Sequence, residues 1–189
     1  MKRIDRLIKA IGRAGAPVAL GLDTRPEYLP DGFARDAGGI RAFNFVLIDA
    51  LADIVPCVKV QAAVYEALGL PGMEAFRDTL ARAAEKGMLT IADVKRNDIG
   101  ATAEAYAAAY LGSPSGSGLP PFAADFVTVN AYLGADGVSP FLDACEKTGR
   151  GVFVLTRTSN PSAGEFQDLT VRGSGGIERP LYEEVGLRV

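Results

Sequence analysis

The residues of this 189-residue sequence best suited to proton chemistry are a lysine and the acids around it. The segment 93–98, DVKRND, places Lys95 two residues after Asp93 and three residues before Asp98. A lysine beside carboxylates in an apolar strand is costly to desolvate unless the pairing compensates or takes part in chemistry. The neighbouring carboxylates favour the charged form of Lys95, so the segment predicts an ammonium group that can donate a proton.

Two further charged residues stand near the ends of apolar runs. Asp23 follows the run VALGL, and Lys59 lies near the end of the run CVKVQ. Taken alone, Asp23 is more often a turn residue and Lys59 more often a solvated edge residue. Side chains alternate along a strand, so we expect Asp93 and Lys95 to point the same way. Together the runs predict one charged rim where parallel strands end, which is where α/β proteins place their sites.

Composition excludes several other kinds of site. The chain has no histidine, so a Ser/His/Asp triad, a His general base and a His-ligated zinc site are excluded. Cys57 and Cys145 lack the spacing of metal ligands. With 20 basic and 23 acidic residues, the chain has a net charge of −3, which argues against nucleic-acid binding. The charged first helix and the lack of a membrane-spanning run predict a cytoplasmic protein with no membrane partner.

Short apolar runs alternate with segments of helical spacing along the chain, which predicts an α/β fold in which strands alternate with helices. Apolar residues at helical spacing predict helices near the N-terminus and over 40–54 and 73–83, and another over 180–189. Near-continuous apolar runs are typical of a parallel sheet covered by helices. We expect a single domain over 1–189, with a Gly/Ser/Pro loop insertion near 112–121 and a polar stretch with Gly173–Gly176. The expected strands are Val18–Leu22, Cys57–Gln61, Met88–Val94, Asp125–Asn130 and Gly151–Thr156.

The segment 93–103, DVKRNDIGATA, resembles the signature of orotidine 5′-phosphate decarboxylases, in the longer-chain branch typical of many bacteria. Other segments agree with this resemblance in the same order along the chain. They are GLD with Arg25-Pro26, VKVQAAVYE around Lys59, NAYLG at 130–134, TSNP at 158–161 and FQDL at 166–169. The resemblance implies a (β/α)₈ TIM barrel that works as a homodimer. It also implies removal of CO₂ from orotidine 5′-monophosphate to give UMP in pyrimidine biosynthesis, with no metal or organic cofactor.

The resemblance assigns roles to the charged residues. Asp23 and Lys59 would hold hydroxyl groups of the ribose. Asp93 would face the carboxylate of the substrate, and Lys95 would protonate C6 as CO₂ leaves. Such chemistry needs an ammonium group aimed at the carbon on which negative charge develops.

The resemblance also implies a site shared between two subunits. Asp98 would reach across the dimer interface to the ribose of the other subunit, and Ile99 and Thr102 would line the same site. Ser159 would bond the pyrimidine ring, with Thr158 and Asn160 as close competitors for that role.

The length differs from that of a whole barrel. A (β/α)₈ barrel takes about 250 residues, and its phosphate site commonly lies after strands seven and eight. We count five strands, so we expect about the first five β/α units and no phosphate-binding segment. Binding energy from a remote phosphate normally serves the transition state, so we expect weak or no activity from the chain alone.

Two alternatives stay open at this point. One is a Mg²⁺-dependent sugar-phosphate lyase or decarboxylase of the same superfamily, which shares the Asp-x-Lys-x-x-Asp pattern. The other is a non-catalytic remnant that binds a ligand without turnover. A Mg²⁺-dependent rate would favour the first, and nucleotide binding without CO₂ release would favour the second.

Overall fold

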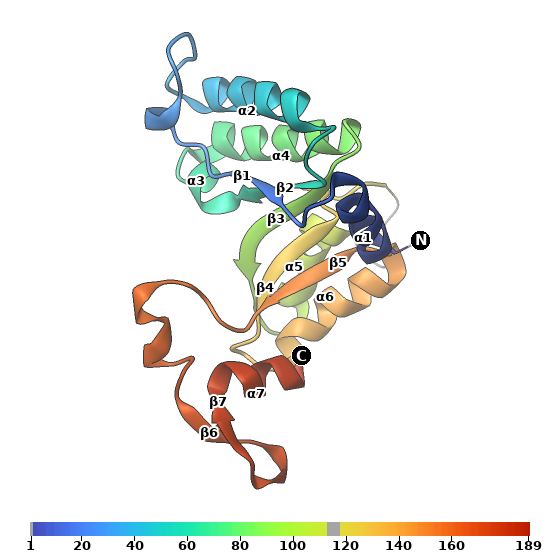
Figure 1. The fold of residues 1–189 in the computed structure, drawn as a ribbon, viewed down its shortest axis with the longest axis vertical. Coiled ribbons are helices and arrows are strands. Elements are labelled where there is room, and N and C mark those ends of the chain that lie inside the picture. Colours follow the sequence, from blue (N-terminus) through green and yellow to red (C-terminus); the bar gives the residue numbers. More distant parts are fainter. Residues whose placement is uncertain (1, 113–117) are drawn as a thin grey trace.

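Five parallel strands form one sheet in the computed structural model of the chain, which describes residues 2–112 and 118–189 (Figure 1). The strands neighbour one another in chain order, β1-β2-β3-β4-β5, and every pairing is parallel. Parallel neighbours need a crossover, which explains why helices separate them in the sequence. The strands are β1 (Ala19–Leu22), β2 (Cys57–Gln61), β3 (Leu89–Arg96), β4 (Phe126–Asn130) and β5 (Gly151–Leu155).

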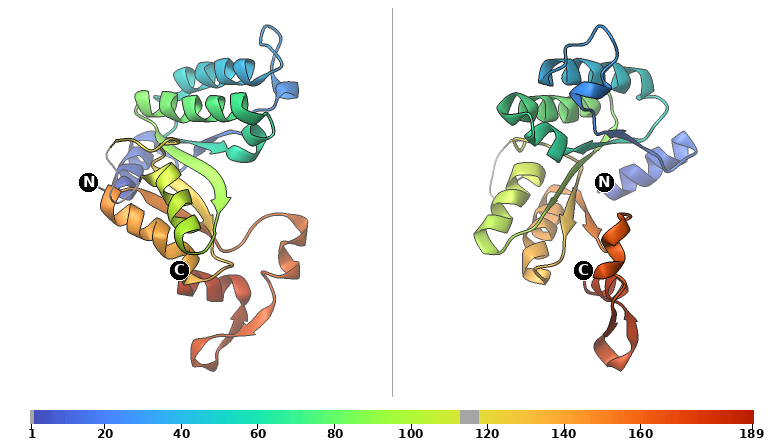
Figure 2. Two further views of the ribbon diagram at one scale, coloured as in Figure 1. Left: turned by 180° about the vertical axis from the view of Figure 1, so that it is seen from behind. Right: turned by 90° about the vertical axis from the view of Figure 1, so that its left-hand side faces the viewer.

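Helices cover one face of this sheet, and a single helix covers part of the other face (Figures 1 and 2). On the first face, α2 lies beside α4, and α5 lies beside α6. On the second face, α1 packs against the amino-terminal half of the strands. The helices are α1 (Arg3–Ala14), α2 (Ala37–Leu51), α3 (Ala62–Glu66), α4 (Gly69–Glu85), α5 (Gly100–Leu111), α6 (Ala135–Thr148) and α7 (Leu181–Arg188).

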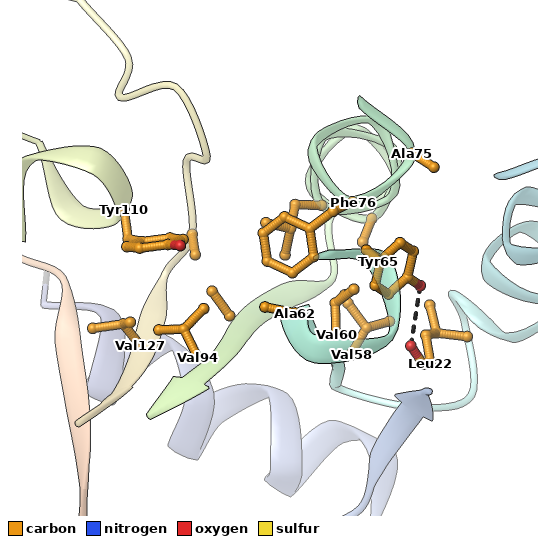
Figure 3. Close-up of a cluster of buried hydrophobic side chains, with 14 of the residues drawn as sticks. Leu22, Val58, Val60, Ala62, Tyr65, Ala75, Phe76, Val94, Tyr110 and Val127 are labelled. Atoms are coloured by element: carbon orange, nitrogen blue, oxygen red, sulfur yellow. Dashed lines mark hydrogen bonds between the residues drawn. The ribbon is translucent and has the colours of Figure 1, made fainter. Parts of the chain in front are cut away.

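The main core lies between the sheet and its helices. Val58 and Val60 of β2 are fully buried under Tyr65 of α3 and Phe76 of α4, whose rings lie 5.5 Å apart (Figure 3). The Tyr65 hydroxyl donates a hydrogen bond to the Leu22 carbonyl at 3.0 Å, which ties α3 to the end of β1. A buried hydroxyl needs such a partner. The packing therefore fixes the carboxyl ends of β1 and β2 relative to each other.

The opposite face of the sheet changes character along the strands. Near their starts it is apolar and buried by Leu7 and Ala10 of α1. Because side chains alternate, the same face turns polar two to four residues further along. The apolar set is Cys57, Leu89, Ile91 and Phe126, and the polar set is Lys59, Gln61, Asp93 and Thr128.

The α/β prediction is confirmed, and four expected strands match to within one residue at each end. β3 extends two residues beyond Val94, to Arg96. The expected helix over 40–54 is wrong at its end, because α2 stops at Leu51. The N–H groups of Ile54 and Val55 both donate to the Leu51 carbonyl as the chain turns toward β2, and the Ile54 side chain is exposed.

The last part of the chain holds a hairpin that the sequence pattern did not show. A two-stranded antiparallel hairpin, β6 (Thr170–Arg172) and β7 (Glu178–Pro180), turns through Gly175 at a φ of +81°. The hairpin projects away from the sheet (Figures 1 and 2). The helix expected over 180–189 is confirmed as α7. Of the expected loop insertion near 112–121, residues 113–117 lie outside the described residues. In the described ranges no helix combines the length and apolar character needed to cross a membrane.

Candidate active site

Three consecutive strands bring charged side chains to the carboxyl edge of the sheet. Asp23 follows β1 directly, β2 carries Lys59, and β3 carries Asp93 and Lys95. In the β2–β3 ladder Gln61 pairs with Asp93, so these two side chains share one face. The structure thus brings together all four residues that the sequence placed at this rim.

The Asp93 carboxylate is the centre of the cluster, and four side-chain groups surround it. Lys95 Nζ lies 2.7 Å and the Thr128 hydroxyl 2.8 Å from Oδ1. Gln61 Nε2 lies 3.1 Å and Lys59 Nζ 3.4 Å from Oδ2. The Asp93 side chain is only 8 % exposed, so these donors replace the water that an ionised carboxylate requires.

The surroundings of Asp93 keep it ionised. Burial, the largest single influence, acts to raise the pKa of Asp93. Hydrogen bonds from Lys95 and Thr128, together with the positive charges of Lys95 and Lys59, outweigh burial and leave the pKa of Asp93 below its ordinary value. The site therefore holds a buried negative charge between two ammonium groups.

Lys59 bridges two carboxylates. Its Nζ lies 3.1 Å from Asp23 Oδ1 as well as 3.4 Å from Asp93 Oδ2. The Asp23 side chain is 54 % exposed, so the pair on that side is solvated and weak. Asp23 therefore offers an accessible carboxylate beside a lysine that is already anchored to the buried one.

An irregular stretch of β3 sets the position of Lys95. The β3–β4 register shifts between Ala92 and Arg96, and Lys95 has a φ of +49°, the one positive value among the described non-glycine residues. This left-handed conformation costs about 1–2 kcal/mol for a residue with a Cβ. Asp93 and Lys95 meet as expected, although the register of β3 against β4 is irregular between them, as at a β-bulge.

The second carboxylate of the motif lies apart from this cluster. Asp98 stands in the loop before α5, where its Oδ1 accepts the N–H of Ile99 at 2.8 Å. In the described chain the ion pair of Lys95 is with Asp93, and Asp98 does not pair with Lys95. The reason is that the chain leaves β3 and starts α5 at this point. Ile99 and Thr102 are exposed beside Asp98.

The loop after β5 holds the remaining expected residues. The Thr158 hydroxyl donates to Asn160 Oδ1 at 2.6 Å, and the Thr158 N–H donates to Gln167 Oε1 at 2.7 Å. Ser159 lies exposed between them. A cavity of about 520 Å³ at the ends of β4 and β5 is lined by Thr158 and Gln167 among others, and Ser159 is not part of its lining.

Comparison with known proteins identifies the family. Residues 17–180 match the family model described as "Orotidine 5'-phosphate decarboxylase / HUMPS family". The chain belongs to this family. The curated orotidine 5′-phosphate decarboxylase of Clostridium acetobutylicum is 42 % identical over 190 residues, and that of Rhodopirellula baltica is 44 % identical over 192 residues. These alignments cover 98 % and 95 % of this chain but 62 % and 61 % of the relatives.

A solved structure agrees with the family and the fold. The structure of the Leishmania donovani OMP decarboxylase superposes with a TM-score of 0.79 at 28 % identity, covering 100 % of this chain and 64 % of that one. The fold-class prediction, a (β/α)₈-barrel family with about five β/α units in this chain, is confirmed. The chain thus spans about three fifths of the length of the family members it matches.

Two polar residues of the cluster were not predicted from the sequence of this chain. Gln61 and Thr128 both contact Asp93, yet neither belongs to a charged motif. Strand alternation could have found them. Gln61 lies two residues after Lys59, and Thr128 lies two residues before Asn130, so strand alternation puts each on the same face as its partner. A polar residue at such a position within an apolar strand is a signal of a site.

Proposed function

We propose that this chain carries the catalytic edge of an orotidine 5′-monophosphate decarboxylase, which releases CO₂ and forms UMP in pyrimidine biosynthesis. The observation that carries the proposal is the buried Asp93 carboxylate held between Lys95 at 2.7 Å and Lys59 at 3.4 Å. Membership of the decarboxylase family supplies the reaction class.

Asp93 and Lys95 share the chemical step in this proposal. Asp93 faces the substrate carboxylate. The bond between C6 and the carboxylate carbon breaks, its electron pair stays on C6, and CO₂ leaves. The Lys95 ammonium then transfers a proton to C6, and the resulting amine regains a proton from water.

The chemical step depends on electrostatics that the site fixes before the reaction begins. The C6 carbanion is poorly delocalised, so positive charge must already point at C6. Lys95 is oriented by its contact with Asp93, so little reorganisation is needed as the charge develops. Loss of one such preorganised donor typically lowers kcat by about 10²–10³.

The other residues bind the nucleotide. Asp23 and Lys59 hold ribose hydroxyls, which suits the exposed Asp23 carboxylate beside Lys59. We assign contacts with the pyrimidine to the loop 158–160, with Ser159 as the expected contact. The position of Thr158 beside the cavity supports Thr158 as the competing assignment.

We further propose a homodimer in the cytoplasm. Asp98 would reach the ribose in the partner site, with Ile99 and Thr102 lining it. The Ile99 side chain is 60 % exposed in the single chain, so covering it with a second copy would remove apolar surface from water. Sedimentation of the purified chain tests the dimer, and a monomer at every concentration would contradict it.

We also propose that neither a metal nor an organic cofactor takes part, because two lysines supply the positive charge. The test is incubation of the 189-residue chain with orotidine 5′-monophosphate and chromatography for UMP, with EDTA or with added Mg²⁺. We expect UMP at equal rates in both, well below an ordinary turnover of about 10 s⁻¹. UMP formed only with Mg²⁺ would contradict the cofactor-free step, and Mg²⁺-dependent turnover of a sugar phosphate without UMP would favour the sugar-phosphate lyase. Nucleotide binding without UMP would favour the non-catalytic one.

A further inference from the structure

The Thr128 hydroxyl on β4 has a fully determined hydrogen-bond pattern. It donates to Asp93 Oδ1 at 2.8 Å and accepts the N–H groups of Val94 and Lys95, each at 2.9 Å. A threonine hydroxyl has one hydrogen and two lone pairs. The two N–H groups occupy both lone pairs, so the hydroxyl hydrogen is left to point at Asp93.

This single side chain acts on both reacting groups of the proposed step. The two N–H bonds fasten the backbone where the β3–β4 register shifts and where Lys95 takes its positive φ. The donated bond turns Asp93 Oδ1 toward β4 and Lys95, which leaves Oδ2 for Lys59 and Gln61.

We propose that Thr128 is a positioning residue for the decarboxylation, because its hydroxyl holds the bulged backbone that aims Lys95 and orients the Asp93 carboxylate. The inference rests on the proposed function, since it takes Asp93 and Lys95 as the groups that meet the substrate. Thr128 itself needs no contact with the nucleotide.

Two substitutions separate the hydroxyl from the shape of the side chain. Thr128→Val keeps the branched shape and leaves two backbone N–H groups and one carboxylate oxygen without this partner. Thr128→Ser keeps the hydroxyl and removes only the methyl group.

A matched control exists at the other end of the same strands. Thr90 of β3 is buried, and its hydroxyl accepts the Asp125 N–H at 2.9 Å and donates to Asp125 Oδ2 at 3.3 Å. Thr90→Val therefore removes a comparable pair of buried hydrogen bonds away from Asp93 and Lys95.

The experiment is NMR on the 189-residue chain and its Thr128→Val, Thr128→Ser and Thr90→Val variants. It follows hydrogen exchange of the Val94 and Lys95 amides and the titration of the Asp93 carboxyl carbon. Thr128→Val should speed hydrogen exchange of both amides about tenfold. It should also raise the pKa of Asp93, because the hydrogen bond from Thr128 is lost while the charges of Lys59 and Lys95 stay in place. Thr128→Ser should restore both readouts, and Thr90→Val should move neither. With substrate, kcat should fall in Thr128→Val with KM nearly constant, and Ser should rescue it.

The proposal is overturned if Thr128→Val leaves exchange and titration unchanged, or if Thr90→Val moves them equally. Should Thr128→Val not fold, the wild type and Thr128→Ser decide the matter, because both amides must be protected in both proteins. These readouts do not need turnover. A wild type that never decarboxylates would contradict the proposed function, whereas unmoved readouts would contradict the role of Thr128.

Discussion

Lys95 Nζ lies 2.7 Å from Asp93 Oδ1, and Lys95 reaches this contact from a left-handed backbone conformation with a φ of +49°. The contact is therefore held at the expense of local backbone strain. Strain of this kind persists only where the surroundings determine it, and it is frequent at functional sites. Here the surroundings are the hydroxyl of Thr128 and the buried carboxylate of Asp93.

The strain at Lys95 predicts an unusual order of stability between two variants. Both Lys95→Ala and Lys95→Gly remove the ammonium group, but only glycine adopts a positive φ freely. We expect the Gly variant to be more stable than the Ala variant by up to about 1 kcal/mol. Urea unfolding measures this difference.

Lys59, on the neighbouring strand, is the control for that comparison. It lies in β2, outside the positions with positive φ, so Lys59→Gly should be less stable than Lys59→Ala by about 0.5–1 kcal/mol. If the same order held at Lys95, the account of its backbone would be wrong.

Asp93 predicts a pH dependence of stability. Because the pKa of Asp93 is lowered in the folded protein, its charged form stabilises the fold above its unfolded pKa of about 3.9. This contribution is lost as the pH falls through the lower, folded value. Urea unfolding of the wild type and Asp93→Asn should differ most near pH 7, and the difference should shrink below about pH 4. A difference that grows toward low pH would contradict the lowered pKa.

Lys59 makes two ion pairs, and we expect the longer one to be the stronger. The pair with Asp23 is shorter, 3.1 Å against 3.4 Å, but Asp23 is exposed whereas Asp93 is buried. Double-mutant cycles should give about 0.2–1 kcal/mol for Lys59 with Asp23 and a larger coupling for Lys59 with Asp93. Equal or reversed couplings would show that burial does not govern this cluster.

Gly137, near the start of α6, lies against the loop that carries Asp98, so a side chain there should displace that loop. A Cβ at Gly137 would stand 2.3 Å from Asn97 Oδ1 and 2.9 Å from the Asp98 carbonyl oxygen. We expect Gly137→Ala to destabilise the fold by about 1–3 kcal/mol and to shift the amide resonances of Asp98 and Ile99.

Gly12 in α1 offers the opposite case, because a Cβ there would meet nothing within 4 Å. Gly12→Ala should therefore stabilise the fold by up to about 1 kcal/mol. Destabilisation by both variants to the same degree would mean that the contact at Gly137 is not the cause.

The sequence predicted the strands well because apolar runs such as 57–61 and 126–130 are read directly as buried parallel strands. It placed Asp23, Lys59, Asp93 and Lys95 at one rim because parallel strands end on the same side. The bulge was not predictable in this way. It depends on a hydroxyl of β4, 33 residues after Lys95 in the chain, and no local pattern around Lys95 signals it.

Other features that the sequence did not predict have similar causes. α6 has Pro140 within it, which weakens a helical pattern read from sequence alone. The β6–β7 hairpin has three-residue strands whose residues are exposed or half-buried, so it shows no apolar alternation. Asp98 shares a motif with Lys95, but its direction is set by the start of α5, which the spacing of acids does not show.

The measurement that tests the central claim most directly is CO₂ release from carboxyl-labelled orotidine 5′-monophosphate by the 189-residue chain, its Lys95→Ala variant and a Lys9→Ala control on the exposed side of α1. The account predicts slow release by the wild type and the control, and a loss of at least about 100-fold in Lys95→Ala. Equal release by the wild type and Lys95→Ala would contradict it, because the ammonium held by Asp93 would then have no part in the reaction.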